Sequence, residues 1–438
     1  MEQEILEEWG DVPLLDIVEA TGTPLYVMDE TIIRKRFKEY SKAFPKADIF
    51  YAVKANSNLS LLRILAQEGA GADVFSDGEL YMALAAGIPP KKILFNGNSK
   101  SDWDLIAAKN TGVRVSVDSI DELITLSNMF AENGKPMEIA FRVNPDVCPE
   151  THPRIATGLA ESEFGIPHDR VLEAYKLALE SPGVKPVGIH CHIGSQILDT
   201  DVFSETTHKM MSLVKQIKEN LGIILDFVDL GGGLGIDYTG KDDAPRPQNL
   251  ASAILPVYEE WCQRTGYNPR LILEPGRSLV ADSTILLTRI NFVKEAKRLF
   301  AGVDAGFNVL MRPTLYGSYH RIIPVGQKTK GPRRKYTVVG PMCETDILAE
   351  DRTLPELKRG DVLAFMDTGA YGFSMSSQYN GRTRPAEVLV KQGTWDVIRD
   401  RESYSDLLLR QRVPARLLSG DPPSRFLPVA EPVPSRSS

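Results

Sequence analysis

Between residues 31 and 274, short apolar runs alternate with amphipathic stretches of helical period, and this alternation constrains the fold more than any other feature. Strands separated by helices pair in parallel, because each helix carries the chain back along the sheet. Eight runs have strand character, and these are Ile49–Lys54, Gly71–Phe75, Ile93–Asn96, Val113–Val117, Glu138–Arg142, Pro186–His192, Leu225–Leu230 and Leu271–Glu274. Eight such units in this length are typical of an α/β fold of the TIM type, a (β/α)8 barrel.

A different pattern begins after Pro275. The helical period stops, and β-type runs follow at Thr284–Val293, Lys335–Val339, Val362–Met366, Ala386–Val390 and Thr394–Ile398, the last two forming a predicted hairpin. We therefore expect the barrel at residues 28–277 and a β-sandwich or β-barrel-like domain at residues 1–27 and 278–411. The proline-rich residues 412–438 are expected to form a disordered tail.

The composition argues against several classes of protein. The chain has 438 residues, and its 58 acidic and 51 basic residues give a net charge of −7 without a basic stripe, so we expect no nucleic-acid partner. It shows no signal-peptide pattern and no apolar run of bilayer length, so we expect a cytoplasmic protein without membrane contact. The four cysteines, Cys148, Cys191, Cys262 and Cys343, lack Cys-x-x-Cys spacing, which argues against a disulfide framework or a zinc site.

Polar residues follow seven of the eight predicted barrel strands, and the active site of such a barrel lies at the carboxyl ends of its strands. These residues are Lys54, Asp73, Ser76, Asn96, Asn98, Arg142, Asn144, His192, Ser195, Glu274 and the glycines at 231–233. Any one of them could be an ordinary loop residue. The whole set, at corresponding strand ends, predicts an active site.

A lysine ends the first predicted strand. In Tyr51-Ala52-Val53-Lys54-Ala55-Asn56, an apolar run leads directly into Lys54 and a small polar loop. A lysine amine that loses solvent deprotonates readily, which suits an amine that forms a Schiff base. Taken alone, Lys54 could equally be a surface lysine at a strand end, so its neighbours must decide the interpretation.

A glycine-rich segment follows the seventh predicted strand. Asp229-Leu230-Gly231-Gly232-Gly233-Leu234-Gly235 would let backbone N–H groups approach an anion closely. A dinucleotide fingerprint that starts at Gly231 would need a third glycine where Ile236 stands. The segment therefore predicts a site for a single phosphate, with a glycine turn that closes the barrel as the alternative.

Two histidines lie two residues apart on the sixth predicted strand, in Gly188-Ile189-His190-Cys191-His192-Ile193-Gly194-Ser195-Gln196. On one face of a strand they could chelate a metal ion. No third histidine or carboxylate stands nearby at ligand spacing, so we expect no metal site. We predict that His192 stacks on a flat ring and that His190 has a structural role.

The segment Glu274-Pro275-Gly276-Arg277 places a carboxylate and a guanidinium at the mouth of the eighth predicted strand. A carboxylate opposite a pyridine nitrogen keeps that nitrogen protonated, and the ring then withdraws electrons strongly, as a pyridoxal cofactor must. A salt bridge at the barrel end is the alternative interpretation of this motif.

Together these motifs resemble those of the alanine-racemase-fold decarboxylases, which depend on pyridoxal 5'-phosphate. The resemblance extends from about residue 20 to residue 408 and rests on residues 51–56, 190–196, 231–235 and 274–277. Within that family, residues 312–317 and 367–387 are similar to segments of the diaminopimelate decarboxylases. The resemblance implies a lyase of lysine biosynthesis that converts meso-2,6-diaminopimelate to L-lysine and CO2.

The resemblance also implies residue roles. Lys54 would hold the cofactor as a Schiff base, His192 would stack on it, and Cys343 would return a proton to the substrate carbon. The remaining cofactor-binding residues would be Asp73, Ser195, Gly232, Gly233, Glu274, Gly276, Arg277 and Tyr371, and the substrate-binding residues would be Arg277, Arg312, Tyr316, Glu344 and Tyr371. In this family Cys343 and Glu344 would reach into the site of a second subunit, so a homodimer with shared active sites is implied.

Arg312 separates substrate classes by charge. A guanidinium suits a distal carboxylate through a bidentate contact, whereas a distal amine would repel it. Three alternatives remain open: a decarboxylase of a modified diamino acid with a distal carboxylate, an amino-acid racemase, and a non-catalytic cofactor-binding homologue. A racemase would usually carry arginine in place of Glu274, and the third class would lack Lys54 or Cys343.

Overall fold

The computed structural model describes residues 5–131, 135–147, 162–241, 243–326 and 332–417. It divides into two compact units, Ile32–Ala281 on the one hand and Met1–Thr31 with Asp282–Ser438 on the other. We expected the divisions at residues 28 and 277; strand β3 (Leu25–Asp29) pairs within the sheet of the second of these units and takes it past residue 27. Of the predicted tail, residues 418–438 lie outside the described residues.

The unit at residues 32–281 is a closed barrel of eight parallel strands. In spatial order these are β4 (Asp48–Ala52), β5 (Gly71–Val74), β6 (Ile93–Phe95), β7 (Arg114–Val117), β8 (Met137–Asn144), β10 (Val184–His190), β11 (Phe227–Asp229) and β12 (Arg270–Leu273), and β12 pairs again with β4. The short strand β9 (Ile166–Pro167) adds to β8. All eight predicted runs are therefore strands, and the predicted barrel is confirmed.

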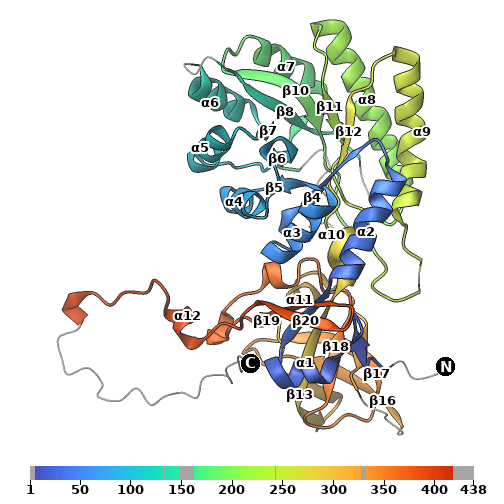
Figure 1. Cartoon of the computed structure of the whole chain (residues 1–438), viewed down its shortest axis with the longest axis vertical. Helices are drawn as coiled ribbons and strands as arrows, with labels where there is room; N and C mark the ends of the chain where they lie inside the picture. The colour runs from blue at the N-terminus through green and yellow to red at the C-terminus, as the bar shows by residue number, and fades with distance from the viewer. Residues whose placement is uncertain (1–4, 132–134, 148–161, 242, 327–331, 418–438) are drawn as a thin grey trace. The chain divides into compact units, whose positions relative to one another are not determined.

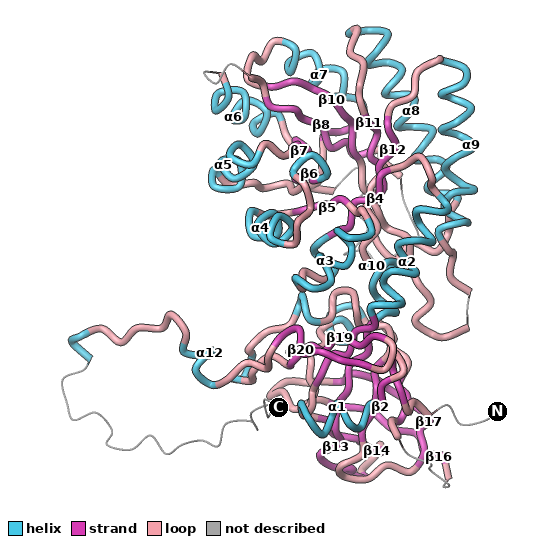
Figure 2. The backbone as a smooth tube through the Cα atoms, viewed as in Figure 1, coloured by secondary structure: helices cyan, strands magenta, loops and turns pink. Residues whose placement is uncertain are grey.

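Helices surround this barrel, as the cyan ribbons around the magenta strands in Figure 2 show. They are α2 (Glu30–Ala43), α3 (Leu59–Glu68), α4 (Asp77–Ala85), α5 (Asp102–Thr111), α6 (Ile120–Phe130), α7 (Val171–Leu179), α8 (Asp201–Leu221), α9 (Pro247–Thr265) and α10 (Arg277–Val280). Side-chain caps begin several of them; Ser76, for example, accepts from the Glu79 N–H at 3.2 Å. The helices α3 to α9 lie between successive barrel strands and return the chain, so that these strands end at the same rim of the barrel.

Side chains fill the barrel interior. Phe50, Leu94, Ala140, Val187, Phe227 and Ile272 form one buried cluster. Two glycines make room for its rings: a Cβ on Gly188 would lie 2.2 Å from Phe227, and one on Gly71 would lie 2.2 Å from Phe50. The barrel is thus a packed core, and its chemistry is confined to the rims.

The other unit is rich in β-structure, as expected. Its elements are β1 (Glu8–Trp9), β2 (Val12–Pro13), α1 (Leu14–Thr21), β3, β13 (Thr284–Glu295), β14 (Leu299–Val303), α11 (Arg312–Tyr316), β15 (Ile322–Pro324), β16 (Arg333–Val339), β17 (Ile347–Pro355), β18 (Val362–Phe365), β19 (Ala386–Lys391), β20 (Thr394–Arg399) and α12 (Tyr404–Leu408), as labelled in Figure 1. The main sheet has the order β17-β16-β14-β13-β3-β19-β20. The predicted β19–β20 hairpin is present, with positive φ at Gln392 and Gly393.

Strand β13 organises two apolar cores in this β domain. Its residues alternate between them: Leu286 and Ile290 belong to one core, and Ile285 and Leu287 to the other. β3 and β18 alternate in the same way. A strand that is buried on both faces reads as a continuous apolar run, which is why this segment was recognisable in the sequence.

Candidate active site

Lys54 lies at the rim formed by the carboxyl ends of the barrel strands. Strand β4 ends at Ala52, and Lys54 follows in a short 3-10 turn (Val53–Ala55) rather than in the strand itself. Its Nζ forms an ion pair with the Asp73 carboxylate at the end of the neighbouring strand β5, and it lies 5.4 Å from the centre of the Phe75 ring. Asp73 is buried while Lys54 is half-exposed, so the amine remains accessible from the rim.

Asn96, at the end of β6, joins Asp73 to Glu274. Its Nδ2 donates to Asp73 Oδ1 and to Glu274 Oε1, both at 2.7 Å. Burial and the charge of Glu274 raise the pKa of Asp73 in spite of Lys54. Burial alone would also raise the pKa of Glu274, but the positive charge and hydrogen bonding of His190, together with Lys54, lower it to about 2. Glu274 is therefore an anion although it is buried.

His192 follows β10 and presents a neutral ring. Its Nδ1 accepts from the Gly232 N–H at 3.2 Å, so in the neutral ring the hydrogen is on Nε2. Burial and the positive charges of Lys54 and Arg142 lower the pKa of His192 to about 3. An uncharged flat imidazole fits the predicted stacking role.

The glycine-rich segment packs too closely for side chains. A Cβ on Gly232 would lie 2.1 Å from the Glu274 carbonyl oxygen, and one on Gly233 would lie 2.5 Å from the Gly194 carbonyl oxygen. Positive φ angles at Gly231 and Gly233 add a second requirement for glycine. The segment thus requires glycine in order to pack against the ends of β10 and β12.

Arg277 connects two further rim residues. Its Nη2 donates to Ser195 Oγ at 2.9 Å, and its Nη1 donates to Tyr238 Oη at 2.7 Å. Tyr238 was not among the predicted residues, because it lies on a loop after the glycine-rich segment and no motif marks it. Ser195 and Arg277 are 82 residues apart, and the fold joins them.

These barrel residues fit pyridoxal phosphate. Gly231, Gly232 and Gly233 present backbone without side chains at the rim, Lys54 is an accessible amine, Glu274 is a buried anion, and His192 is a neutral ring. Each of these features matches one part of the cofactor: phosphate, aldehyde, ring nitrogen and ring face.

No carboxylate stands near the two histidines in the sequence, but the fold supplies two beside one of them. His190 has two carboxylates beside it, because β10, β11 and β12 are neighbours: Asp229, Glu274 and His190 bring their ligand atoms within 4.8 Å of one another. Such a trio could coordinate a metal ion. The ion pair of His190 with Glu274 at 3.3 Å and the hydrogen bond from the Gly231 N–H to Asp229 at 2.8 Å account for the arrangement without one.

The remaining predicted residues lie in the β domain. Arg312 opens α11 and is buried; its Nη1 donates to His320 Nε2 at 2.9 Å, and His320 Nδ1 donates to the Met366 carbonyl at 2.8 Å. This relay holds a buried guanidinium in one orientation. His320 escaped the sequence analysis because a lone histidine beside a tyrosine carries no signal.

Cys343 and Glu344 are exposed, and a single short turn (Tyr379–Gly381) holds both of them. Asn380 Oδ1 accepts from the Cys343 N–H at 3.0 Å, and Asn380 Nδ2 donates to Cys343 Sγ at 3.2 Å. Tyr379 Oη lies 3.6 Å from the same sulfur and donates to Glu344. Hydrogen bonds from Tyr379 and Asn380 lower the pKa of the thiol.

The loop that carries Cys343 is closed by Asp346. The Phe307 N–H donates to Asp346 Oδ1 at 2.9 Å, and the Met342 N–H lies 3.3 Å from Oδ2. Gly306 and Gly340 leave space for this carboxylate, since a Cβ on Gly340 would approach it to 2.0 Å. Asp346 is thus a local staple directly after Cys343-Glu344-Thr345.

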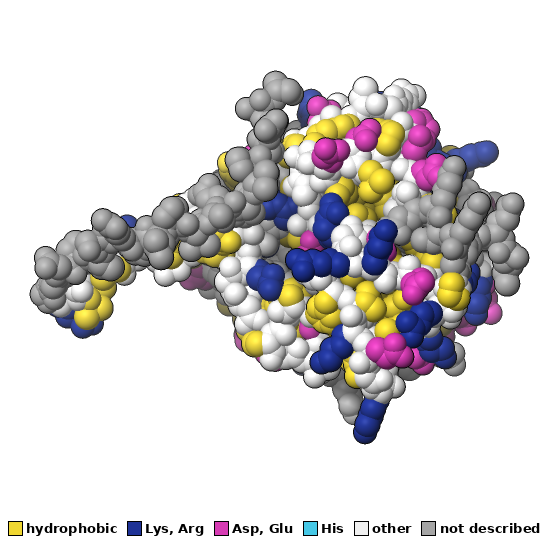
Figure 3. Space-filling view, turned by 90° about the horizontal axis from the view of Figure 1, so that it is seen from below, with side chains coloured by type: hydrophobic (Ala, Val, Ile, Leu, Met, Phe, Trp, Pro, Cys, Tyr) yellow, Lys and Arg dark blue, Asp and Glu magenta, His cyan; other side chains and the backbone are white. Residues whose placement is uncertain are grey.

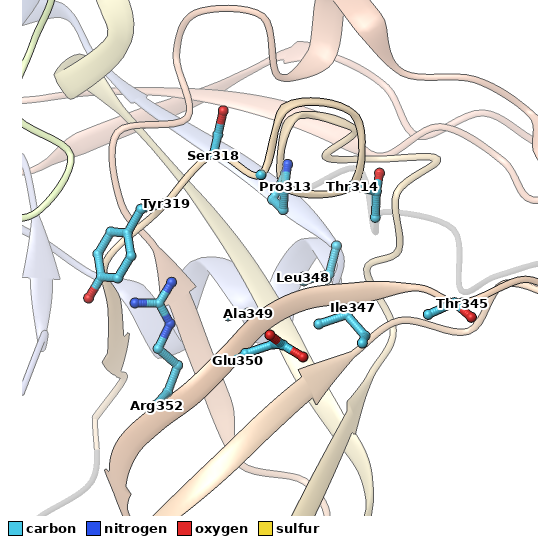
Figure 4. A pocket seen from close by; sticks show the side chains of 11 residues that line it. Pro313, Thr314, Ser318, Tyr319, Thr345, Ile347, Leu348, Ala349, Glu350 and Arg352 are labelled. Carbon is cyan, nitrogen blue, oxygen red and sulfur yellow. The ribbon is translucent and has the colours of Figure 1, made fainter. Parts of the chain in front are cut away.

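A cavity of about 520 Å³ separates α11 from β17 in this domain. Figure 4 shows Pro313 and Thr314 on one wall, Ile347 and Glu350 on the other, and Tyr319 beside Arg352. The Arg352 guanidinium lies 3.5 Å from the centre of the Tyr319 ring. Arg312 and Tyr316 do not line the cavity.

Tyr371 is partly buried and has a φ of 58°, a conformation that residues other than glycine rarely adopt.

The outer surface carries side chains of mixed character. On the face shown in Figure 3, basic and acidic side chains occur among apolar ones. Among the described residues, no helix combines the length and the apolar character needed to cross a membrane.

Comparisons with known proteins identify the family of the chain. The family described as "Pyridoxal-dependent decarboxylase, pyridoxal binding domain" matches residues 30–281. A diaminopimelate decarboxylase of Archaeoglobus fulgidus is 56% identical over 408 residues, which cover 93% of this chain and 97% of the relative. The relative of that name from Methanothermobacter thermautotrophicus is 46% identical and is covered to 96%, with 93% of this chain aligned.

A solved structure extends the agreement to three dimensions. The diaminopimelate decarboxylase of M. jannaschii in complex with L-lysine has a TM-score of 0.88 and 42% identity, with 92% of this chain and 95% of that chain covered. The barrel fold and the nearly full-length similarity thus point the same way. The chain belongs to the pyridoxal-dependent decarboxylase family, among the diaminopimelate decarboxylases.

Proposed function

We propose that this pyridoxal-phosphate-dependent decarboxylase acts on meso-2,6-diaminopimelate and releases L-lysine and CO2, the last step of lysine biosynthesis. When bound, pyridoxal phosphate supplies a conjugated ring that accepts the electron pair left behind as CO2 departs. The observation that carries the proposal is the network of Lys54, Asp73, Asn96 and Glu274 at the barrel rim. The names of the relatives support the substrate.

Residues of the barrel would bind the cofactor. Lys54 would hold it covalently and give way to the substrate amine, with Asp73 as the ionic partner of Lys54. Glu274 would keep a proton on the ring nitrogen, and His192 would cover one ring face. Ser195, Gly232, Gly233, Gly276 and Arg277 would bind the phosphate, and Tyr371 would close over it.

Residues of the β domain would select the substrate. Arg312, with Tyr316 and Arg277, would bind the distal carboxylate, and Glu344 would bind an amino group of the substrate. The Cys343 thiol would deliver a proton to the carbon that lost CO2. A buried guanidinium opposite a distal ammonium would cost several kcal/mol, which disfavours lysine and ornithine as substrates.

A homodimer would complete each site. Cys343 and Glu344 are exposed although their proposed roles need enclosure, so the barrel of a second subunit would cover them. Such a dimer would work in the cytoplasm, where its amino-acid substrate is made.

Two assays test the proposal. Borohydride reduction followed by peptide mass spectrometry should place the cofactor on Lys54, and no label on Lys54 would refute the cofactor assignment. CO2 release should occur with diaminopimelate and not with lysine, ornithine or arginine. Release from ornithine or arginine without release from diaminopimelate would refute the role of Arg312.

A further inference from the structure

The carboxylate of Glu274 is held from both sides. Asn96 donates to Oε1 at 2.7 Å, and His190 Nε2 lies 3.3 Å from Oε2. All three side chains are at most 4% exposed. Asn96 offers a neutral hydrogen bond, whereas His190 can offer a charge, so His190 is the partner that can fix the ionisation of Glu274 as well as its orientation.

His190 is itself oriented from behind. As the last residue of β10, it places Nδ1 2.9 Å from the Ser116 hydroxyl of the buried strand β7. When the hydroxyl donates to Nδ1, the ring hydrogen is on Nε2, the nitrogen that lies 3.3 Å from Glu274 Oε2; the imidazolium carries a hydrogen on the same nitrogen. Only the opposite tautomer would set a lone pair against the carboxylate, and that contact is repulsive. Ser116 fixes the position of the ring and accommodates the forms of His190 that carry a hydrogen on Nε2, since its hydroxyl can donate to a neutral Nδ1 or accept from the imidazolium.

The surrounding charges divide unequally between the two carboxylates next to His190. Burial and the charge of Glu274 raise the pKa of Asp229, whereas His190 and Lys54 outweigh burial and lower that of Glu274 to about 2. The surroundings thus favour the negative charge on Glu274 over Asp229. The other titratable groups that act on this pair are Lys54, Asp73, Arg142, Cys191 and His192.

We propose that His190, oriented by Ser116, is a positioning residue that keeps Glu274 anionic and aimed at the nitrogen of the cofactor ring. The inference rests on the proposed role of Glu274 and replaces the purely structural role expected for His190. It acts through Glu274 and needs no contact between His190 and the cofactor. A space-filling role would require only the volume of the imidazole, whereas this role requires its Nε2–H.

The test measures the ring nitrogen directly. Holoenzyme is prepared with 15N-labelled pyridoxal phosphate, and the 15N chemical shift is followed against pH for the wild type, His190→Gln and His190→Leu. We expect the protonated fraction to fall in that order, since glutamine keeps a donor and leucine keeps only volume. Turnover of His190→Leu should fall about tenfold or more with KM changed less than about twofold, because one pKa unit at the ring nitrogen corresponds to tenfold in its protonated fraction.

Two further variants keep the test decisive. Ser116→Ala perturbs the same relay without emptying the charge cluster and should give a smaller shift in the same direction, which covers the case that His190→Leu does not fold. Thr207→Val removes a buried hydroxyl that bonds only within α8, to the Phe203 carbonyl, and should leave the 15N titration unchanged. Wild-type 15N titrations in folded His190→Leu and Ser116→Ala would overturn the inference. A wild-type enzyme without the Lys54-bound label would instead refute the proposed function itself.

Discussion

The barrel rim and the Cys343 turn belong to one proposed reaction but are built in opposite ways. At the rim, Asp73, Asn96, His190 and Glu274 are at most 4% exposed and bond to one another. Around Cys343, the thiol, Glu344 and their partners Tyr379 and Asn380 are exposed. The side chains at the rim are ordered and buried before any ligand binds. Those of the turn are ordered by their hydrogen bonds but remain exposed.

The two regions differ in how strongly their charged groups interact. Charges in a buried network act at low effective dielectric, so removal of one partner leaves another unpaired at a cost of about 3–5 kcal/mol. Exposed partners are screened by water and contribute little until a second surface excludes it. Rim substitutions should therefore act within one chain, and turn substitutions should act through a partner.

Mixing two inactive variants tests that division with the largest expected effect. Lys54→Ala and Cys343→Ala should each lose activity by about a thousandfold or more, because each removes a group that no neighbour replaces. After mixed refolding, heterodimers with one intact shared site should restore about a quarter of wild-type activity. Recovery is measured as CO2 release against each variant refolded alone. An unrestored mixture would show that both residues act within one chain, and full activity of Cys343→Ala alone would show that another group supplies the proton.

A matched pair of glycine substitutions tests how tightly the rim is built. Gly232→Ala sets a Cβ 2.1 Å from the Glu274 carbonyl oxygen, whereas Gly78→Ala meets nothing nearer than Ser76 Oγ at 3.7 Å. The first should weaken cofactor affinity about a hundredfold, as a shift of about 3 kcal/mol would, and the second should leave it unchanged. Fluorescence titration with pyridoxal phosphate measures both affinities. Equal affinities in the two variants would mean that the segment is a turn without a binding role.

Acid stability offers a third test of the rim. Because the folded-state pKa of His192 is depressed to about 3 from 6.5, the unfolded chain binds the proton first, and stability falls as pH drops below about 6.5. Between pH 7 and pH 5 this one group should lower the free energy of unfolding by about 2 kcal/mol. That is within the limit of about 1.4 kcal/mol per pH unit for a single proton. Urea unfolding of the cofactor-free protein should show that loss, and His192→Asn should show less of it. The same pH dependence in both proteins would contradict a neutral His192.

The smallest expected effect concerns the exposed turn. Removing the Asn380 side chain deletes two hydrogen bonds to Cys343, so the pKa of the thiol should rise in Asn380→Ala and alkylation by iodoacetamide at neutral pH should slow by a few-fold. Asn380→Gly also removes them but relaxes the positive φ of 56° at this position, which separates hydrogen bonding from backbone strain. Unchanged alkylation in both variants would remove Asn380 from the account of Cys343.

Much of the fold was predictable, and the failures share a cause. The barrel strands are mostly apolar and buried, so period and length revealed them. Strand β17 was missed because its centre, Glu350 to Thr353, is charged or exposed and carries a positive φ at Asp351, as suits the edge of a sheet. Helix α5 carries only a weak amphipathic pattern, because it exposes Trp103 and buries only Leu105 and Ala108.

The site divided in the same manner. Residues that stand in motifs, such as Lys54, Glu274 and the glycines, could be found in the sequence. His320, Asn380, Tyr238 and Ser116 could not, because each gains its meaning from a partner brought close by the fold. The supporting residues of an active site are chosen by three-dimensional neighbours, and one sequence does not record those.

Strand β3 has a consequence for synthesis of the chain. It lies between β13 and β19, so residues 25–29 complete their pairing only after residue 390 has been made. The whole barrel emerges from the ribosome in that interval, and at about 5–20 residues per second the wait lasts roughly 20–70 s. In a nascent chain this apolar amino-terminal segment therefore stays unpaired, and prone to aggregation, while the central domain folds. A chaperone that binds near the amino terminus would protect it.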